Sequence, residues 1–187
     1  MSHDNNPVIV LDRDGVINED SPDYIKSPDE WRAIPGSLDA IAKLNHAGYK
    51  TVVATNQSGV GRGLFDIDTL WDIHQKMLAE IDAAGGHITR IFFCPHTPDD
   101  DCDCRKPKPG MLRQAAEYLA CGLDNMIIIG DSARDLEAAR AVGARTILVR
   151  TGKGKDTEKS MAPELADAVF DDLAAAAEAL LAKSGAL

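Results

Sequence analysis

Short apolar runs alternate along this sequence with longer stretches in which apolar residues recur at helical spacing. The short runs are typical of strands buried on both faces, and the longer stretches are typical of helices with one apolar side. Strands that alternate with helices of about 10–18 residues indicate βαβ units and an α/β fold with a mostly parallel central sheet. The expected strands are 8–11, 51–54, 88–93, 126–129, 146–149 and a short edge strand at 168–170. The expected helices are 37–47, 66–84, 111–120, 135–142 and 171–183.

The segments between these elements are expected to be irregular. They are the polar, Pro-containing segment 16–36, the Gly-rich loop 55–63, the Cys- and Pro-rich loop 94–110 and a Gly/Lys turn at 151–155. Ser37 and Asp66 precede apolar-periodic runs and are expected to cap the helices there. Because the sequence contains no internal repeat, linker or low-complexity segment, residues 1–187 are predicted to form one domain.

The charge balance excludes several classes of partner. The chain has a net charge of −10, which argues against nucleic acid or an anionic membrane surface as a partner, since both require a basic face. No apolar run approaches the roughly 20 residues of a membrane span. Residues 1–6 are polar and contain no apolar targeting segment, so a cytoplasmic location is expected. No obvious exposed apolar stripe is present, and a monomer is therefore the expected state.

Acidic and hydroxyl side chains follow three of the predicted strands directly. Asp12 and Asp14 follow the first strand and start out on the same side of an extended chain, where two carboxylates repel unless a cation lies beside them. Thr55 follows the second strand and Asp131 the fourth. Ligands of open parallel sheets bind beyond the carboxyl ends of the strands, so we expect these residues at one rim. The alternatives are a solvated Asp-Gly turn, a plain turn after Thr55, and an ordinary helix start for Asp131 and Asp135.

This rim has the ligands and cations that phosphate chemistry requires. A nest of carboxylates suits Mg²⁺, which prefers carboxylates, water and a substrate phosphate. The hydroxyl groups of Thr55 and Ser58 and the backbone N–H groups of the Gly-rich turn can hold phosphate oxygens. Arg105 and Lys106 begin a basic cluster that prolines stiffen, although a solvated loop is the alternative. Fixed cations beside a metal favour phosphoryl transfer, because negative charge must be neutralised during the transfer.

A cluster of soft metal ligands lies in the loop 94–110. Cys94 and His96 are separated by one residue, as are Cys102 and Cys104, and two such pairs can converge on a tetrahedral zinc ion. Four protein ligands leave no open position, so the predicted role is structural: the metal would order the loop and deliver the basic cluster to the rim. The alternatives are a reducible disulfide or unrelated thiols. Cys121 lies outside the cluster and is interpreted as a packed thiol.

Several of these segments together resemble a known family. The pattern Asp12-Arg13-Asp14-Gly15, Thr55-Asn56-Gln57, Lys106 and Gly130-Asp131 with Asp135 is similar to the four motifs of the haloacid dehalogenase (HAD) superfamily of phosphatases. The motifs DRDGVIN at 12–18, TNQSG at 55–59, CPH at 94–96 and CDCRKPKPGM at 102–111 resemble one branch, the bacterial heptose 1,7-bisphosphate 7-phosphatases with the related histidinol-phosphate phosphatases. The resemblance covers about residues 8–182 and implies a Rossmann-like three-layer sandwich.

The resemblance also implies catalytic roles. Asp12 would be the nucleophile that forms an aspartyl-phosphate, and Asp14 would protonate the leaving oxygen and then help to activate water. Thr55 and Lys106 would steady the transferring phosphoryl group. The implied Mg²⁺ ligands are Asp12, the backbone carbonyl of Asp14, and Asp131, with Asp135 behind them.

Contacts to the rest of the substrate follow from the same resemblance. The implied substrate-binding residues are Arg13, Asp20, Tyr24, Asn56, Gln57, Ser58 and Arg105. Two departures affect the finer contacts: the gap between His96 and Cys102 is shorter than in some relatives, and Ser132 stands where others have Lys.

The size of the chain limits how the site can be covered. Neither segment 14–55 nor segment 56–105 has room for a large cap domain, so an open site with a zinc-bound loop is expected. The function that the resemblance implies is Mg²⁺-dependent hydrolysis of the 7-phosphate of D-glycero-D-manno-heptose 1,7-bisphosphate, a phosphorylated sugar of heptose and lipopolysaccharide precursor synthesis. The alternatives are a histidinol-phosphate phosphatase and a non-catalytic zinc-loop protein that binds a phosphorylated partner.

Overall fold

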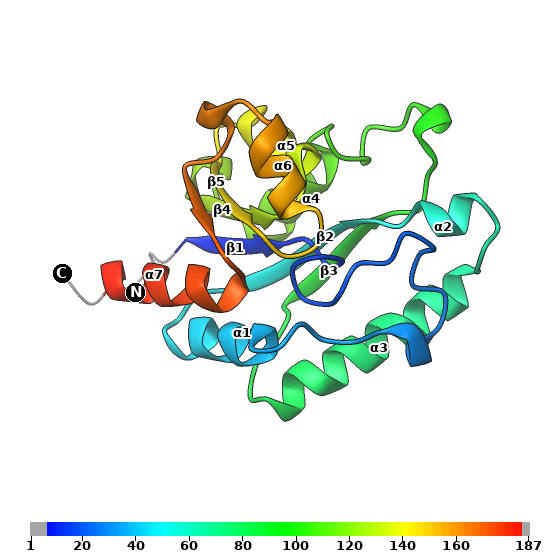
Figure 1. The fold of residues 1–187 in the computed structure, drawn as a ribbon, viewed down its shortest axis with the longest axis horizontal. Coiled ribbons are helices and arrows are strands. Elements are labelled where there is room, and N and C mark those ends of the chain that lie inside the picture. The colour runs from blue at the N-terminus through cyan, green and yellow to red at the C-terminus, as the bar shows by residue number, and fades with distance from the viewer. Residues whose placement is uncertain (1–6, 185–187) are drawn as a thin grey trace.

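A six-stranded parallel sheet forms the centre of the protein (Figure 1). The computed structural model describes residues 7–184. The strands are β1 (Val8–Leu11), β2 (Thr51–Asn56), β3 (Arg90–Cys94), β4 (Met126–Gly130), β5 (Arg145–Val149) and β6 (Ala168–Phe170). They are arranged in the order β3-β2-β1-β4-β5-β6, and each pair of neighbours is parallel.

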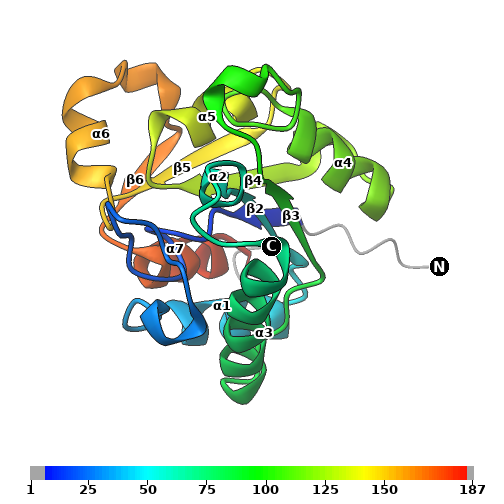
Figure 2. The ribbon, with the colours of Figure 1, turned by 90° about the vertical axis from the view of Figure 1, so that its right-hand side faces the viewer.

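Helices cover both faces of the sheet (Figures 1 and 2). The α-helices are α1 (Ser37–His46), α2 (Ser58–Gly61), α3 (Ile67–Ala83), α4 (Gly110–Leu119), α5 (Ala133–Arg140), α6 (Gly154–Ser160) and α7 (Leu173–Ser184). Helices α1, α3 and α7 pack on one face, whereas α4 and α5 pack on the other, which gives three layers.

The central strand shows why the sequence forms this sandwich. All four residues of β1 are buried, because each face of the strand is covered by helices. Ile9 and Leu11 belong to the core with α1, α3 and α7, and Val8 and Val10 belong to the core with α4 and α5. Successive side chains of a strand point to opposite faces of the sheet, so a strand with helices packed on both faces is apolar at every position.

The predicted fold class is confirmed, with local differences. No large cap domain interrupts the part of the chain from 7 to 184. Asp66 caps α3 by accepting a hydrogen bond from the Thr69 N–H, as predicted. Ser37 was expected to cap α1, but it is the first helical residue, and its hydroxyl donates to the carbonyl of Ile17 instead. The residue at the cap position is Gly36, whose φ is +83°.

One helix begins earlier than predicted, and another was not predicted at all. Helix α5 begins two residues before the predicted start at Asp135, because Ser132 and Asp135 form a reciprocal capping box around its first turn. Helix α6 occupies part of what was expected to be a Gly/Lys turn at 151–155. Its sequence, GKDTEKS, contains no large apolar residue and so gives no amphipathic signal.

Two sequence-based expectations concern membranes and targeting. Within residues 7–184, no helix combines the length and the apolar character needed to cross a bilayer. The polar segment 1–6, from which a targeting segment was judged absent, lies outside the described residues.

Candidate active site

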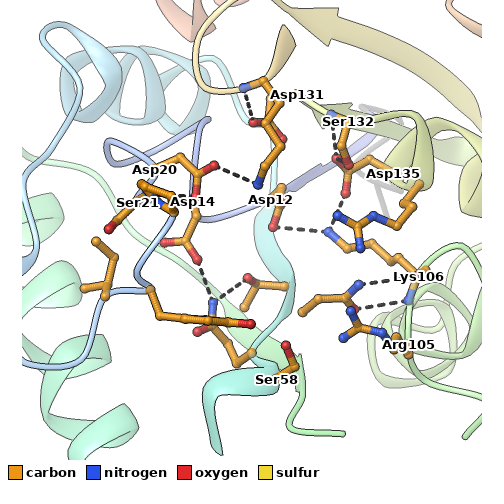
Figure 3. A pocket seen from close by; sticks show the side chains of 18 of the residues that line it. Asp12, Asp14, Asp20, Ser21, Ser58, Arg105, Lys106, Asp131, Ser132 and Asp135 are labelled. Atoms are coloured by element: carbon orange, nitrogen blue, oxygen red, sulfur yellow. Dashed lines mark hydrogen bonds and ion pairs between the residues drawn. The ribbon is translucent and has the colours of Figure 1, made fainter. Parts of the chain in front are cut away.

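A cavity of about 360 Å³ opens at the carboxyl ends of the central strands (Figure 3). Asp12 follows β1, Thr55 lies near the end of β2, and Asp131 follows β4, and all three line the cavity. Since β2, β1 and β4 are neighbours in the sheet, their carboxyl ends bring residues together that are far apart in the sequence. The predicted rim therefore exists as a hollow on the protein.

Lys106 places its ammonium group beside Asp12. The Nζ atom lies 3.1 Å from Asp12 Oδ1 and 2.5 Å from Asp135 Oδ1, and it donates a hydrogen bond of 2.8 Å to the carbonyl of Ala54. Burial on its own lowers the pKa of a lysine, but the carboxylates of Asp12 and Asp135 outweigh it and hold the pKa of Lys106 above its usual range. The cavity thus contains a fixed positive charge next to the predicted nucleophile (Figure 3).

Three carboxyl groups crowd together in the same place. One oxygen of each of Asp12, Asp131 and Asp135 lies within 4.8 Å of the others. Burial, with a further contribution from Asp135, raises the pKa of Asp12 to about 7, although Lys106 opposes the shift. Burial and the nearby Asp12 raise the pKa of Asp131 to about 8. A cation would relieve this repulsion, and the oxygen ligands fit Mg²⁺.

Asp135 differs from the other two carboxyl groups. Its Oδ2 accepts hydrogen bonds from the backbone N–H of Ser132 at 3.0 Å and from the Ser132 hydroxyl at 2.7 Å. Burial raises the pKa of Asp135, but the ion pair with Lys106 and the bonds from Ser132 outweigh it, so the pKa lies below the usual value. Because its oxygens are engaged by protein groups, Asp135 holds Lys106 and leaves Asp12 and Asp131 as the available metal ligands.

Asp131 occupies a narrow slot between two glycines. A Cβ atom at Gly15 would lie 2.1 Å from Asp131 Oδ2, and one at Gly152 would lie 2.2 Å from the same oxygen. Both glycines also have positive φ angles, +84° and +55°, which side chains disfavour. The Lys153 N–H donates to Asp131 Oδ2 at 2.8 Å, and the Thr157 hydroxyl donates to the Asp131 carbonyl at 2.9 Å. The carboxylate is therefore fixed in one orientation.

Asp14 is held by a separate set of donors. Arg13 donates from Nε and Nη2 at 3.0 Å each, Asn18 Nδ2 donates at 2.9 Å, and Gln57 Nε2 donates at 2.8 Å. Burial raises the pKa of Asp14, but the Arg13 guanidinium and the bonds from Asn18 and Gln57 outweigh it, so the pKa is lowered. Asp14 is thus ionised, and its four hydrogen bonds hold it in one orientation at the edge of the cavity.

The predicted substrate contact by Arg13 is corrected by the structure. Arg13 is completely buried and does not line the cavity. It lies between Asp12 and Asp14 at a bend beyond the end of β1, and its side chain is buried in the protein. Its guanidinium binds Asp14 and, at 3.1 Å, Gln57 Oε1. Arg13 therefore supports Asp14 from behind.

The last two residues of β2, Thr55 and Asn56, and the next residue, Gln57, form hydrogen bonds to different parts of the protein. Thr55 is buried, and its hydroxyl oxygen accepts a hydrogen bond of 2.9 Å from Gln57 Nε2. The Asn56 amide binds the backbone of Lys106, and the Gln57 amide binds Arg13 and Asp14. Asn56 and Gln57 line the cavity, but protein groups already engage their amides.

The remaining predicted substrate contacts all lie in the cavity wall. These residues are Asp20, Tyr24, Ser58 and Arg105. Tyr24 has a φ of +65°, a conformation that non-glycine residues rarely adopt. Asp20 pairs with Lys153 through a contact of 2.7 Å between Oδ2 and Nζ, so the segment after β1 and the loop after β5 meet across the cavity.

The cavity wall also contains three basic residues that were not predicted from the sequence, Arg62, Arg134 and Lys153. Lys153 lies in the loop that follows β5, and Arg134 lies in the first turn after β4. The rule that selected Asp12 and Asp131, proximity to the carboxyl end of a strand, also applies to these two positions. Arg62 lies beyond the α2 turn, and nothing in its local sequence indicates the cavity.

The four predicted zinc ligands converge beside the cavity. Cys94 Sγ lies 3.6 Å from both His96 Nδ1 and Cys102 Sγ, and Cys104 Sγ lies 3.3 Å from His96 Nδ1 and 3.5 Å from Cys102 Sγ. All four described cysteines are free, so the alternative of a disulfide does not hold here. A tetrahedron with metal–ligand distances of about 2.1–2.3 Å has edges of about 3.4–3.8 Å. The observed spacings fit such a site.

The cysteine loop is connected directly to the cavity. Arg105 and Lys106 follow Cys104 in the chain, and Arg105 Nη1 donates a hydrogen bond of 3.1 Å to the carbonyl of His96. Cys121 lies outside this group and packs against the core with α4 and α5, as its interpretation as a packed thiol predicts.

Comparison with known proteins gives consistent matches over most of the chain. A model of the HAD-hydrolase-like family matches residues 103–176. The D-glycero-beta-D-manno-heptose-1,7-bisphosphate 7-phosphatase of Pseudomonas putida is 53% identical over 174 residues, which cover 93% of this chain and 99% of that protein. The phosphatase of the same name from Bordetella bronchiseptica is 51% identical, covering 93% and 97% of the two chains.

Solved structures show the same similarity. A crystal structure of D,D-heptose 1,7-bisphosphate phosphatase from B. bronchiseptica, complexed with magnesium and phosphate, superposes with a TM-score of 0.91 at 51% identity and covers 95% of this chain and 99% of that one. The corresponding phosphatase from Burkholderia thailandensis gives a TM-score of 0.75 at 47% identity, with 94% and 99% covered. The chain therefore belongs to the HAD-like hydrolase family, on the branch whose curated members are named D-glycero-beta-D-manno-heptose-1,7-bisphosphate 7-phosphatases.

Proposed function

We propose that this protein is a magnesium-dependent phosphatase that hydrolyses the 7-phosphate of D-glycero-D-manno-heptose 1,7-bisphosphate, in heptose and lipopolysaccharide precursor synthesis. The names of its close relatives support this reaction. The observation that carries the proposal is the position of Asp12, which lies on the cavity between the Lys106 ammonium and the Asp131 carboxylate.

The first step is attack by Asp12 on phosphorus. A bond forms between a carboxylate oxygen of Asp12 and the phosphorus of the 7-phosphate, and the bond from phosphorus to the sugar oxygen breaks. Lys106 is 3.1 Å from Asp12 and neutralises charge on the transferring group, while the buried Thr55 hydroxyl holds a phosphate oxygen. The product of this step is an aspartyl-phosphate and a sugar with a free 7-hydroxyl group.

Asp14 moves the protons in both steps. An arriving phosphate places negative charge near Asp14, and a like charge raises the pKa of the carboxyl group from the lowered value that Arg13 imposes. Asp14 then donates its proton to the leaving sugar oxygen and, once ionised, takes a proton from the water that attacks the aspartyl-phosphate. This attack releases inorganic phosphate and restores Asp12.

Magnesium fits the acidic side of the cavity. Asp12, Asp131 and the backbone carbonyl of Asp14 would hold the ion, and the raised pKa values of Asp12 and Asp131 indicate carboxylates that lack a cation. When bound, Mg²⁺ supplies positive charge that offsets the negative charge of the phosphate. Asp135 keeps Lys106 in place beside this centre.

The rim of the cavity supports a substrate with a second phosphate. Arg105, Arg134 and Lys153 line the cavity in a chain whose net charge is −10. Lys153 is paired with Asp20, whereas the Arg134 side chain has no hydrogen-bond or ion-pair partner in the described part of the chain. A free guanidinium at the mouth suits a phosphate that projects outward from the bound sugar.

We also propose that Cys94, His96, Cys102 and Cys104 bind zinc. Their spacings fit a tetrahedral site with four protein ligands and no open position, so the metal has a structural role. The site would order the loop that carries Arg105 and Lys106. Three expectations stay predictions: the chain forms a single domain, it is a monomer, and it is located in the cytoplasm.

The substrate assignment is tested by comparing two phosphate esters. The purified protein with Mg²⁺ is given D-glycero-β-D-manno-heptose 1,7-bisphosphate or histidinol phosphate, and the loss of each phosphate is followed by ³¹P NMR. Loss of the 7-phosphate alone, with a much higher kcat/KM than for histidinol phosphate, supports the proposal. A preference for histidinol phosphate overturns it, and equal phosphate release by wild type and Asp12→Asn would show that Asp12 is not the nucleophile.

A further inference from the structure

The side-chain amide of Asn56 is bonded to both backbone groups of Lys106. Its Nδ2 donates to the Lys106 carbonyl at 3.1 Å, and its Oδ1 accepts from the Lys106 N–H at 3.1 Å. The amide thus donates to the carbonyl and accepts from the N–H of the same residue, as the backbone of a paired strand does. These two bonds use one of the two N–H donors and one of the two carbonyl lone pairs of the amide, and they hold it in a fixed orientation against the Lys106 backbone.

Lys106 depends on these two bonds. Its side chain is 4% exposed, and it lies in a loop without helix or strand bonds. Within residues 7–184, Asn56 is the partner that the structure gives to its N–H and carbonyl groups. Removing the amide would leave both groups unpaired near the cavity, which favours movement of the loop.

The position of Asn56 explains why it can reach Lys106. It ends β2 and lies in register with Cys94 at the end of β3, so it stands between the phosphate-binding end of the sheet and the cysteine loop. The side chain of Lys106 ends in an ammonium group that contacts Asp12, Asp135 and the Ala54 carbonyl. The lysine is thus fixed at its backbone by Asn56 and at its tip by the cavity floor.

We propose that Asn56 is a positioning residue that aligns Lys106 with Asp12 by clamping the Lys106 backbone. This inference rests on the proposed phosphatase reaction but not on the identity of the sugar. It predicts that the loss of Asn56 affects the chemical step through Lys106, whatever phosphate ester is hydrolysed.

The test replaces the amide and measures three quantities. Asn56→Ala and Asn56→Leu are compared with wild type, because Leu retains the volume of the side chain without the amide. For each variant we would measure kcat and KM with 4-nitrophenyl phosphate, inhibition by orthovanadate, a phosphate mimic without a sugar, and folding by circular dichroism. Both variants are expected to lower kcat about 10- to 100-fold and to weaken orthovanadate inhibition.

Asn45 provides a matched control. Its amide also bridges segments, since Nδ2 donates to the Tyr49 carbonyl and Oδ1 accepts from the His87 N–H, but it lies near the start of β2, away from the cavity. Asn45→Ala is expected to lower the thermal midpoint and to leave kcat unchanged. If Asn45→Ala lowers kcat as much as Asn56→Ala does, general destabilisation accounts for the effect and the proposal is wrong.

A double-mutant cycle with Lys106→Met separates positioning from direct contact. If Asn56 acts through Lys106, adding Asn56→Ala to Lys106→Met changes kcat less than about 2-fold. Equal losses in both backgrounds overturn the proposal, as does a rise in KM for the sugar phosphate without a change in kcat or orthovanadate inhibition. If wild type hydrolyses 4-nitrophenyl phosphate but not the heptose bisphosphate, the sugar assignment fails while this test remains valid.

Discussion

The protein contains two groups of candidate metal ligands that are built in opposite ways. The acidic centre takes Asp12 and Asp131 from the ends of β1 and β4, so it exists only when the sheet is complete. The cysteine cluster takes its ligands from residues 94–104, within one loop. The first group therefore depends on the pairing of distant strands, whereas the second depends on the path of one short segment.

The environments of the two groups follow from this difference. Burial and the crowding of carboxyl groups raise the pKa values of Asp12 and Asp131 in the acidic centre to about 7 and 8, so that ionising both groups without a bound cation is costly. The rigid core around it can sustain that cost. In the cysteine loop, Cys94 is buried in the core and Cys102 and Cys104 are partly buried against it, whereas His96 is exposed. The candidate magnesium ligands therefore lie at the ends of buried central strands, whereas the candidate zinc ligands reach from the core to the surface.

The largest expected effect separates activity from folding at the acidic centre. Asp12→Asn is expected to lower kcat by about 10³-fold or more, because the amide cannot act as the nucleophile. Its thermal midpoint in magnesium-free buffer should not fall, because an amide at this position does not repel the carboxylates of Asp131 and Asp135. Steady-state kinetics and calorimetry measure both values. A large loss of stability would contradict the view that the acidic centre is tolerated by the fold and not required for it.

The cysteine cluster should show the reverse pattern. Cys104→Ser is expected to lower the zinc content and to expose the loop 94–110 to proteases, because the soft ligand set is incomplete. Since Lys106 follows two residues later, kcat should fall about 10-fold, much less than in Asp12→Asn. Zinc is measured by plasma mass spectrometry and cleavage by limited proteolysis. An intact loop without zinc would show that the cluster does not order it.

A smaller effect appears in the pH dependence of stability without a divalent cation. In folded protein Asp12 and Asp131 retain protons up to about pH 7 and 8, whereas in the unfolded chain they ionise near pH 4. At these two groups the folded state therefore binds more protons, and their contribution to stability falls as the pH rises from 6.5 to 8, opposed in part by Cys102, whose pKa is lowered to about 7. Burial lowers the pKa of His74 to about 3, so its opposing contribution is nearly complete above pH 6.5.

Magnesium should reverse this trend. It is expected to raise the thermal midpoint by a few °C, and by more at pH 8 than at pH 6.5, because protons compete with the ion for the carboxylates. Differential scanning calorimetry in chelator-free buffer, with and without Mg²⁺, measures the difference. Asp131→Asn serves as the control and should show a weaker dependence on both pH and Mg²⁺. A midpoint that rises with pH in wild type would be evidence against the raised pKa values.

The smallest effect is expected at the cysteine outside the cluster. Cys121 is half-buried against the core with α4 and α5 and is not among the grouped ligands. Cys121→Ala should keep the zinc content and kcat of wild type and should change the free energy of unfolding by less than about 1 kcal/mol. If zinc is lost in this variant, the assignment of four ligands within residues 94–104 must be revised.

The sequence predicts positions along the chain better than it predicts side-chain partners. Strands and the residues directly after them follow from local patterns, so Asp12, Thr55 and Asp131 were found at the correct edge of the sheet. The direction of Arg13 was not found, because its partner Gln57 lies 44 residues away and becomes a neighbour only through the pairing of β1 with β2.

The two main omissions have related causes. Asn56 binds Lys106 across 50 residues, and no local pattern records such a bond. Helix α6 was missed because it lacks an apolar face, and it is held instead by bonds such as that from Thr157 to the Asp131 carbonyl. Contacts between residues that only the folded sheet brings together are therefore the part of the site that could not be predicted from the sequence.

The pair of glycines around Asp131 also restricts how this protein can diverge. Gly15 and Gly152 come from loops at opposite ends of the chain, yet each leaves room for no more than a hydrogen atom beside the same oxygen. A larger residue at one position cannot be offset by a smaller one at the other, since none is smaller. Both loops must therefore keep glycine at these positions together during evolution. Replacing either loop with one that carries a side chain there would displace the carboxylate that they enclose.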